Sequence, residues 1–229
     1  MSPRRYEMGQ REQALELTRS RIVAAATRLH AERGLLATGW DDIAREAGVS
    51  SVTVYRHFRS LRDLIPACAL SLVAEIRPMT VAEAVAAFAD LPTPRARLAR
   101  LVEGDCDCYQ KGEGWMNAAD REAELIPELG EVVAAQQLTL ERLIRAALEG
   151  TEPSEATVST LRTVIDFPFW KSLRKAGQTP EQAKATILGP IETLVPTQNP
   201  PARLRTGGRP PYPRSCRASP ACGNRTLPR

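Results

Sequence analysis

Residues 39–58, GWDDIAREAGVSSVTVYRHF, constrain the fold most, because they pair two short helices around a single glycine. The spacing predicts a helix over 40–47 and a second over about 51–58, with Gly48 making the turn between them. Val54 and Phe58 lie four residues apart, so they share the face of the second helix that points to a core. The pattern predicts a helix-turn-helix.

The opposite face of the second helix has the chemistry of a groove-reading surface. It carries short hydrogen-bonding groups, one cation and two rings, and no acid: Ser51, Thr53, Arg56 and His57, with Tyr55 at the edge. Such groups can reach phosphates and base edges. Because the first turn of a recognition helix enters the major groove, residues 50–53 are best placed for base contacts. A helical hairpin without a nucleic-acid role is the alternative.

The rest of the chain is also expected to be helical, because no period-2 run bounded by Asn-Gly or Asp-Gly turns is present. Pro66 predicts a kink in one of these helices or a later start for it. The predicted fold class is all-α. Apolar periodicity and Pro-containing breaks place the remaining helices at 12–33, 61–76, 80–90, 93–111, 118–126, 128–149, 154–176 and 179–195.

Charge divides the chain into three regions, which we take as a DNA-binding head, a helical body and a tail. Residues 1–65 hold 11 Lys and Arg against 8 Asp and Glu, residues 66–195 hold 13 against 19, and residues 196–229 hold 7 arginines and no acid. A mildly basic head on an acidic body suits a head that meets phosphates. The Pro- and Arg-rich tail is expected to be disordered, since it has few aliphatic residues to bury. It is either a basic arm for DNA or an unselected segment.

Three elements within residues 19–65 resemble the DNA-binding domain of the tetracycline-repressor (TetR) family. They are AERG at the end of the first helix, DDIAREAGVS, and TVYRHF before the next helix. The resemblance covers about a fifth of the chain; beyond it the chain is similar only as an all-helical body of matching length. It implies an N-terminal three-helix head and a C-terminal body for ligand binding and dimerisation.

The resemblance also implies a function. A homodimeric repressor would place two heads in successive major grooves of a palindromic operator. A small-molecule effector would release it, since effector and DNA weaken each other's binding. By position, Tyr55 and His57 match phosphate contacts, and Ser51, Val52, Thr53 and Arg56 match the base-reading face. The residues expected at double-stranded DNA are Thr38, Trp40, Ser50, Ser51, Val52, Thr53, Tyr55, Arg56, His57 and Arg62.

Two positions depart from the family pattern. Gly39 stands where Ser or Thr usually caps the second helix, and it offers no hydroxyl to a phosphate. Leu61 stands where many members have lysine, and Arg59 or Arg62 could supply the cation instead. Trp40 could pack on the DNA backbone or fill the core of the head. These departures keep open an alternative function, a helical small-molecule-binding protein without DNA recognition.

Aromatic residues of the body gather in two places and could line an apolar effector pocket, although ordinary core packing would look the same. The candidate ligand-binding residues are Tyr109, Trp115, Met116, Phe167, Phe169 and Trp170. The acidic body leans toward a neutral or cationic effector. In the family the last two helices usually form the dimer interface. The apolar positions there suit that role or a packing face within one chain: Leu161, Val164, Ile165, Ile187, Leu188, Ile191 and Leu194.

Other classes of protein lack their characteristic parts here. No phosphate-binding glycine loop, G-x-S-x-G elbow or paired His and carboxylate motif is present, so we expect no enzyme and no cofactor. Cys106 and Cys108 form only a C-x-C pair, and the two histidines lie in the head, so no metal site is expected. A thiol-sensing role for the pair stays a hypothesis. No secretory signal or 18-residue apolar run is present, and five cysteines are scattered, so we expect a cytoplasmic protein without membrane association.

Overall fold

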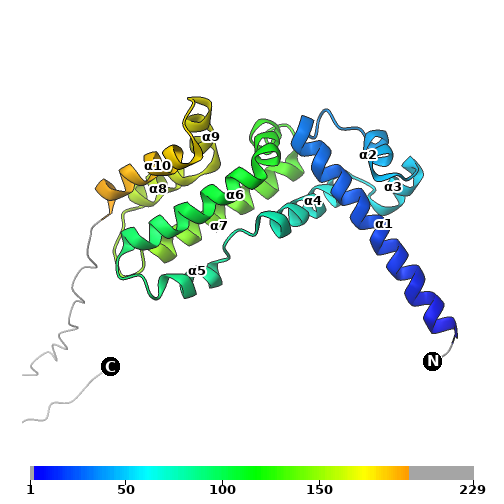
Figure 1. The fold of residues 1–229 in the computed structure, drawn as a ribbon, viewed down its shortest axis with the longest axis horizontal. Helices are drawn as coiled ribbons and strands as arrows, with labels where there is room; N and C mark the ends of the chain where they lie inside the picture. The colour runs from blue at the N-terminus through cyan, green and yellow to red at the C-terminus, as the bar shows by residue number, and fades with distance from the viewer. Residues whose placement is uncertain (1–2, 196–229) are drawn as a thin grey trace, which may run out of the picture.

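The computed structural model describes residues 3–195, with side chains from Gly9 onward. Every regular element in this part of the chain is an α-helix, which confirms the all-α class. The expected disorder of 196–229 concerns residues outside the described ones. Figure 1 shows a head of short helices crossed by one long helix at one end, and a body of longer packed helices at the other.

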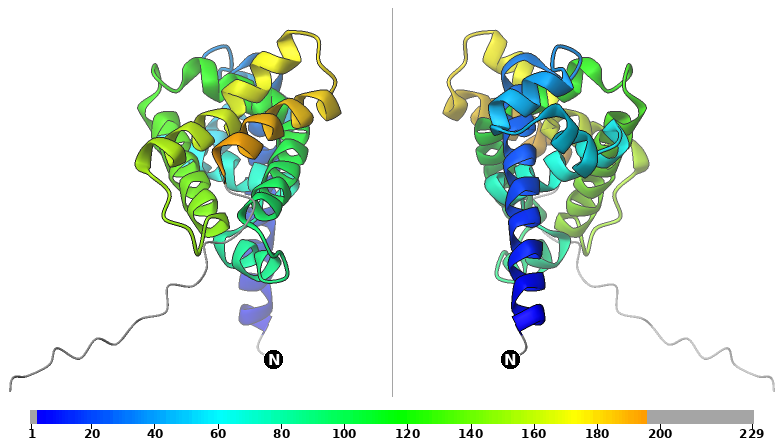
Figure 2. Two further views of the ribbon diagram at one scale, coloured as in Figure 1. Left: turned by 90° about the vertical axis from the view of Figure 1, so that its left-hand side faces the viewer. Right: turned by 90° about the vertical axis from the view of Figure 1, so that its right-hand side faces the viewer.

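The head is built from four helices whose ends follow the local sequence. Gly48 (φ 62°) ends the second helix in the left-handed conformation, and the Ser50 side chain accepts the Thr53 N–H to begin the third. In Figure 2 the N-terminal turns of the first helix extend away from the other helices. The four helices are α1 (Pro3–Arg33), α2 (Trp40–Ala47), α3 (Ser51–His57) and α4 (Leu61–Ile76).

The body contains the remaining helices of the described residues. Four of them begin with a proline in the first turn, where the missing N–H costs nothing. Thr80, Thr93, Ser154 and Thr179 each cap a helix with a side-chain oxygen. The helices are α5 (Val81–Phe88), α6 (Pro94–Glu122), α7 (Pro127–Ala147), α8 (Glu155–Ile165), α9 (Phe167–Lys175) and α10 (Pro180–Leu194).

Helix α4 contributes to two separate hydrophobic cores. Leu64 and Cys68 pack in the head core with α1, α2 and α3, whereas Ile65 and Leu72 pack in the body core. Because α4 serves both cores, the expected boundary between residues 65 and 66 falls inside a helix. Pro66 lies within α4, which begins at Leu61 and therefore does not start late.

One stretch, Leu61–Phe88, is apolar enough by length and composition to cross a membrane. In the fold it is two helices, α4 and α5, because Arg77 ends α4 with a left-handed backbone (φ 50°). Residues 77–80 between the two helices are not helical. The stretch is therefore not one continuous apolar helix.

The body differs from the sequence prediction at two places. Helix α6 runs unbroken from Pro94 to Glu122, where two helices, 93–111 and 118–126, were predicted. The region 154–176 was predicted as one helix, and it is two. Asp166 is extended (ψ 155°) and its carboxylate accepts the Phe167 N–H at 2.8 Å. Pro168 then prevents α8 from continuing, since it has no N–H to donate.

Gly114 lies inside the continuous helix α6 at the point where α6 crosses α1. A Cβ on this residue would lie 2.8 Å from the carbonyl oxygen of Ala31 on α1, closer than real Cβ contacts. The glycine therefore lets the long helices of head and body cross closely. This packing outweighs the low helix propensity of glycine, so α6 continues through the region between the two predicted helices.

We expect Gly114→Ala to lower the free energy of unfolding by about 1–3 kcal/mol, because α1 and α6 must move apart. Gly104→Ala is the matched control on the same helix, since its Cβ would meet nothing nearer than 3.7 Å. That change should be neutral or stabilising by about 0.5–1 kcal/mol. Urea denaturation followed by circular dichroism measures both, and equal stability of the two variants would contradict the close crossing.

Candidate nucleic-acid interface

Two glycines and one carboxylate set the geometry of the helix-turn-helix. Gly39 precedes α2 without a side-chain cap, and the Asp42 carboxylate accepts its N–H at 3.1 Å. This hydrogen bond lowers the pKa of Asp42, and the nearby Arg33 and Arg45 lower it further. After α2, Gly48 turns the chain, and Val49 N–H donates to the carbonyl of Ala44 at 3.0 Å. Asp42 thus satisfies the N–H of Gly39, while no side-chain oxygen of residue 39 caps the first turn of α2.

Hydroxyl groups fix the first turn of α3. Ser50 Oγ accepts the Thr53 N–H at 3.2 Å and lies 2.8 Å from Thr53 Oγ1. Ser51 Oγ donates to the Asp41 carboxylate on α2 at 2.5 Å. Val52, between them, is 75% exposed. Residues 50–53 of the predicted base-reading face therefore lie together at the start of α3, and hydrogen bonds within the head orient the hydroxyl groups of Ser50, Ser51 and Thr53.

The remaining predicted contacts on α3 have distinct surroundings. Tyr55 is 49% exposed and packs against the Trp40 ring, with centroids 5.3 Å apart. Arg56 is exposed and forms no ion pair with the described residues. His57 is half-buried, and its Nε2 is buried without a hydrogen-bond partner. Trp40 thus supports Tyr55 at the edge of the head core, and His57 has only Nδ1 left for a phosphate.

Thr38 and Arg62 make their interactions away from α3. Thr38 Oγ1 donates to the carbonyl of Gly34 at 2.6 Å, so its hydroxyl holds the loop between α1 and α2. Arg62 lies 3.8 Å from Glu131 on α7, and both side chains are largely exposed. The structure therefore gathers Trp40 and residues 50–57 on α3 and its neighbour, but it does not place Thr38 or Arg62 among their partners.

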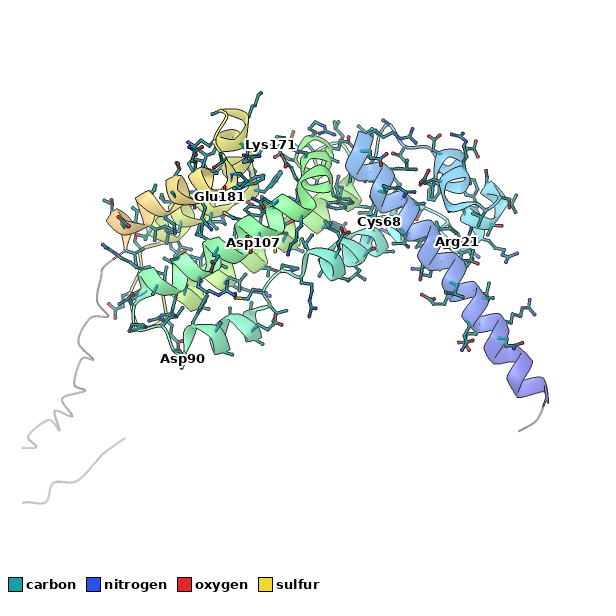
Figure 3. The ribbon with its side chains drawn as sticks, viewed as in Figure 1. Arg21, Cys68, Asp90, Asp107, Lys171 and Glu181 are labelled. Carbon is teal, nitrogen blue, oxygen red and sulfur yellow. The ribbon has the colours of Figure 1, made fainter. Side chains whose placement is uncertain are left out.

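Two arginines of α1 that the sequence analysis did not single out hold the recognition unit. The Arg21 guanidinium donates to the carbonyl oxygens of Ala47 (2.5 Å) and Gly48 (3.3 Å), at the C-terminal end of α2 (Figure 3). The Arg19 guanidinium lies 4.3 Å from the centre of the Phe58 ring. No local pattern could have identified them, because their partners are more than 25 residues away.

A buried carboxylate of the body holds the loop that leads into α2. Glu122, at the end of α6, accepts the N–H groups of Leu35 (2.7 Å) and Leu36 (3.0 Å). Gly34 has φ 93°, and a Cβ there would collide with the Glu122 carboxylate. His30, one turn earlier on α1, is also buried. The path of the loop between α1 and α2 is therefore held by a residue of the body.

The structure brings together only some of the candidate ligand-binding residues of the body. Tyr109, Phe167 and Trp170 form one aromatic cluster, with ring centroids 5.5–5.9 Å apart. Met116 and Phe167 line a cavity of about 280 Å³ between α6, α7 and α9. Trp115 is buried and Phe169 is half-buried in the body core, and neither lines that cavity.

Known proteins share the sequence of the head. Residues 22–68 match the family described as bacterial regulatory proteins, tetR family. The HTH-type transcriptional regulator BetI of Rhizobium meliloti (strain 1021) is 37% identical over 84 residues. These are 37% of this chain and 39% of that regulator, so most of the relative's length is unmatched.

Solved structures share the fold of the head and the body together. A transcriptional regulator from Rhodococcus sp. Rha1 has a TM-score of 0.62 at 20% identity, covering 77% of this chain and 95% of its own. A transcriptional regulator from Saccharomonospora viridis, in complex with choline, has a TM-score of 0.58 at 23% identity, covering 77% and 96%. At these identities the likeness concerns the fold.

The helix-turn-helix of the head therefore matches a DNA-binding domain in sequence, and the all-helical body matches regulators in fold. Residues 22–68 share the sequence of the TetR family of bacterial regulatory proteins, as the elements in 19–65 had indicated.

His30, which is buried near Glu122, is expected to make the stability of the fold depend on pH. Burial lowers the pKa of His30 from 6.5 to about 4, although the Glu122 charge opposes the shift. Between these values the unfolded chain binds a proton that the folded chain does not, so stability falls as the pH drops from about 6.5 to 4. We expect a contribution of up to about 1.4 kcal/mol per pH unit. Urea denaturation at several pH values measures it.

The matched variants are His30→Leu and His57→Leu, which remove the two histidines in turn. His30→Leu should flatten the loss of stability between pH 6.5 and 4, and His57→Leu should retain it. The same slope in both variants would mean that His30 does not carry the effect.

Proposed function

We propose that the chain is a transcriptional repressor that binds a palindromic operator as a dimer and is released by a small-molecule effector. The observation that carries the proposal is the surface of α3, which has exposed hydrogen-bonding and cationic side chains and no acid. A short helix of this kind, held across a second helix by a tight turn, suits the major groove. The proposed location is the cytoplasm, where bacterial DNA lies.

The contacts within the head support a division of roles on α3. We assign base reading to residues 50–53 and to Arg56, because they lie on the first turn or remain free to reach a base edge. We assign phosphate contacts to Tyr55 and His57. Trp40 would act through Tyr55, since the packed rings hold the phenol hydroxyl at the edge of the surface.

The helices α8 and α10 are the proposed contact with a second subunit. Leu161, Ile165, Ile187 and Ile191 are buried within a single chain, so they belong to its own core. Three other apolar positions on these helices remain half-buried or exposed in the single chain: Val164, Leu188 and Leu194. A second copy that covered them would bury apolar surface that now faces solvent.

Helix α6 supports a coupling between effector and DNA. It lines the body cavity with Met116 and Asp120, and its end holds Leu35 and Leu36 through Glu122. A ligand that shifted α6 would therefore shift the loop before α2 and the spacing of the two α3 helices. Effector and DNA would then prefer different states, as reciprocal release requires.

The decisive experiment is selection of DNA by the full-length protein from a random duplex pool. We expect a palindrome to be enriched. We also expect Arg56→Ala to bind it about 5- to 150-fold more weakly, which is the usual effect of losing one base contact. Fluorescence anisotropy at several salt concentrations measures the affinity. Arg142→Ala, at an exposed arginine of α7, is the matched control and should bind as the parent does.

Two outcomes would count against the repressor. If no duplex is enriched, the second candidate replaces it, a small-molecule-binding protein without DNA recognition, which Gly39 and Leu61 favour. If Arg56→Ala and Arg142→Ala bind equally, the assignment of Arg56 to base reading fails.

Leu188→Arg should convert a dimer into a folded monomer, because it places a charge in the proposed apolar contact between subunits. Sedimentation velocity measures the mass, and circular dichroism confirms that the helices remain. Leu70→Arg is the control, since Leu70 is an apolar residue of α4 that is 71% exposed. A dimer that survives Leu188→Arg would place the interface elsewhere.

A further inference from the structure

Three aromatic rings pack together near the junction between α8 and α9, where the helix is interrupted. The Tyr109 ring from α6 lies 5.5 Å from Phe167 and 5.9 Å from Trp170, and these two lie 5.8 Å apart, centroid to centroid. Tyr109 donates its hydroxyl to the carbonyl of Ile165 at 3.0 Å. The Arg174 guanidinium already lies 5.7 Å from the Trp170 ring, so this aromatic cluster has a face that attracts cations.

Two carboxyl groups lie near these rings, and neither forms an ion pair with a described residue. Asp105 lies one turn before Tyr109 on α6, and its Oδ2 is buried without a hydrogen-bond partner in the described chain. Burial, and then the negative charge of Asp166, raises the pKa of Asp105 to about 7. Asp166 is half-buried, accepts the Phe167 N–H, and also has a raised pKa because of burial. The charge of Arg162 offsets only part of this effect on Asp166, so a bound positive charge would stabilise the carboxylate further.

A cavity opens directly beside this group. It has a volume of about 280 Å³, and Asp166 and Phe167 belong to its wall. Its other polar lining consists of two carboxylates and two amides, and no basic residue lines it: Asp120, Glu124, Gln136 and Gln137. Lys171 of α9 is not part of the lining, but it pairs with the lining Asp120 at 2.8 Å and compensates that carboxylate (Figure 3).

The lining selects the charge and the size of an occupant. An anion would face carboxylates and gain no basic partner, whereas a cation would gain Asp166 and the face of an aromatic ring. Apolar wall residues such as Met116 and Val133 suit alkyl groups on that cation. The volume is near the lower end of ligand pockets, about 300 Å³, which limits the occupant to a small metabolite.

We propose that this cavity binds a small alkylated organic cation, with its positive charge between the Asp166 carboxylate and the Phe167 ring. The inference rests on the proposed function, because this cation would be the effector that releases DNA. It names the chemical class of that effector, which the fold alone leaves open.

Calorimetric titration of the full-length protein tests the cation directly. The probes are choline and tetraethylammonium, and 3,3-dimethylbutan-1-ol serves as the uncharged isostere of choline. We expect at least one cation to bind about tenfold or more tightly than the alcohol, which has the same shape without the charge. If the alcohol binds as well as the cations do, or if neither cation binds, the charge assignment is overturned.

Two aspartate variants locate the site. Asp166→Asn removes the charge and keeps an oxygen that can accept the Phe167 N–H, so we expect about tenfold weaker cation binding in a folded protein. Asp107→Asn is the matched control, because Asp107 is exposed on α6 and lines no part of the cavity (Figure 3). Equal binding by both variants would move the cation away from Asp166.

DNA binding measured in the same preparation separates this inference from the proposed function. Specific DNA binding without cation binding would refute the cation site and leave the repressor intact. Cation binding that does not weaken DNA binding would establish the site and refute its role as the effector site.

Discussion

A buried carboxylate with two backbone donors joins the two cores of this chain. Charge-assisted hydrogen bonds from Leu35 and Leu36 to Glu122 are among the stronger ones available to a protein, and breaking them would leave two N–H groups without partners. The loop that they fix leads within a few residues to Gly39 and α2. Since α2 and α3 pack as one unit, the direction of the α3 surface depends on this contact with α6 together with the contacts that α1 makes with α2.

The head was largely predictable because its determinants are local. Gly48, the Ser50 cap and the spacing of Val54 and Phe58 all act within 20 residues, and each does in the structure what the sequence indicated. The long-range contacts were not predictable. Glu122 lies 87 residues from Leu35, and nothing in its neighbourhood distinguishes it from the exposed acids of the same helix.

In the body, apolar periodicity did not predict where two of the helices begin and end. The prediction left a gap between residues 111 and 118, but Gly112 and Gly114 pack closely against Ile76 and Ala31 there, and the helix is continuous. The Phe-Pro-Phe segment at 167–169 continued an apolar pattern, and the capping of α9 by Asp166 instead divides it into two helices. Of the aromatic candidates, Tyr109, Phe167 and Trp170 come together only because of that division, which a single sequence does not reveal.

Because α4 belongs to both cores, it determines which segment of the chain can be exchanged for that of a related protein. A head cut at residue 65 would lose Cys68 from its own core and would leave Ile65 without the body residues that cover it. A chimera that joins this head to another body must carry the whole of α4, and the new body must offer a carboxylate where Glu122 stands. The segment that must be transferred to keep the geometry of the head is therefore larger than the helix-turn-helix. It includes the whole of α4 and depends on the body surface around Glu122.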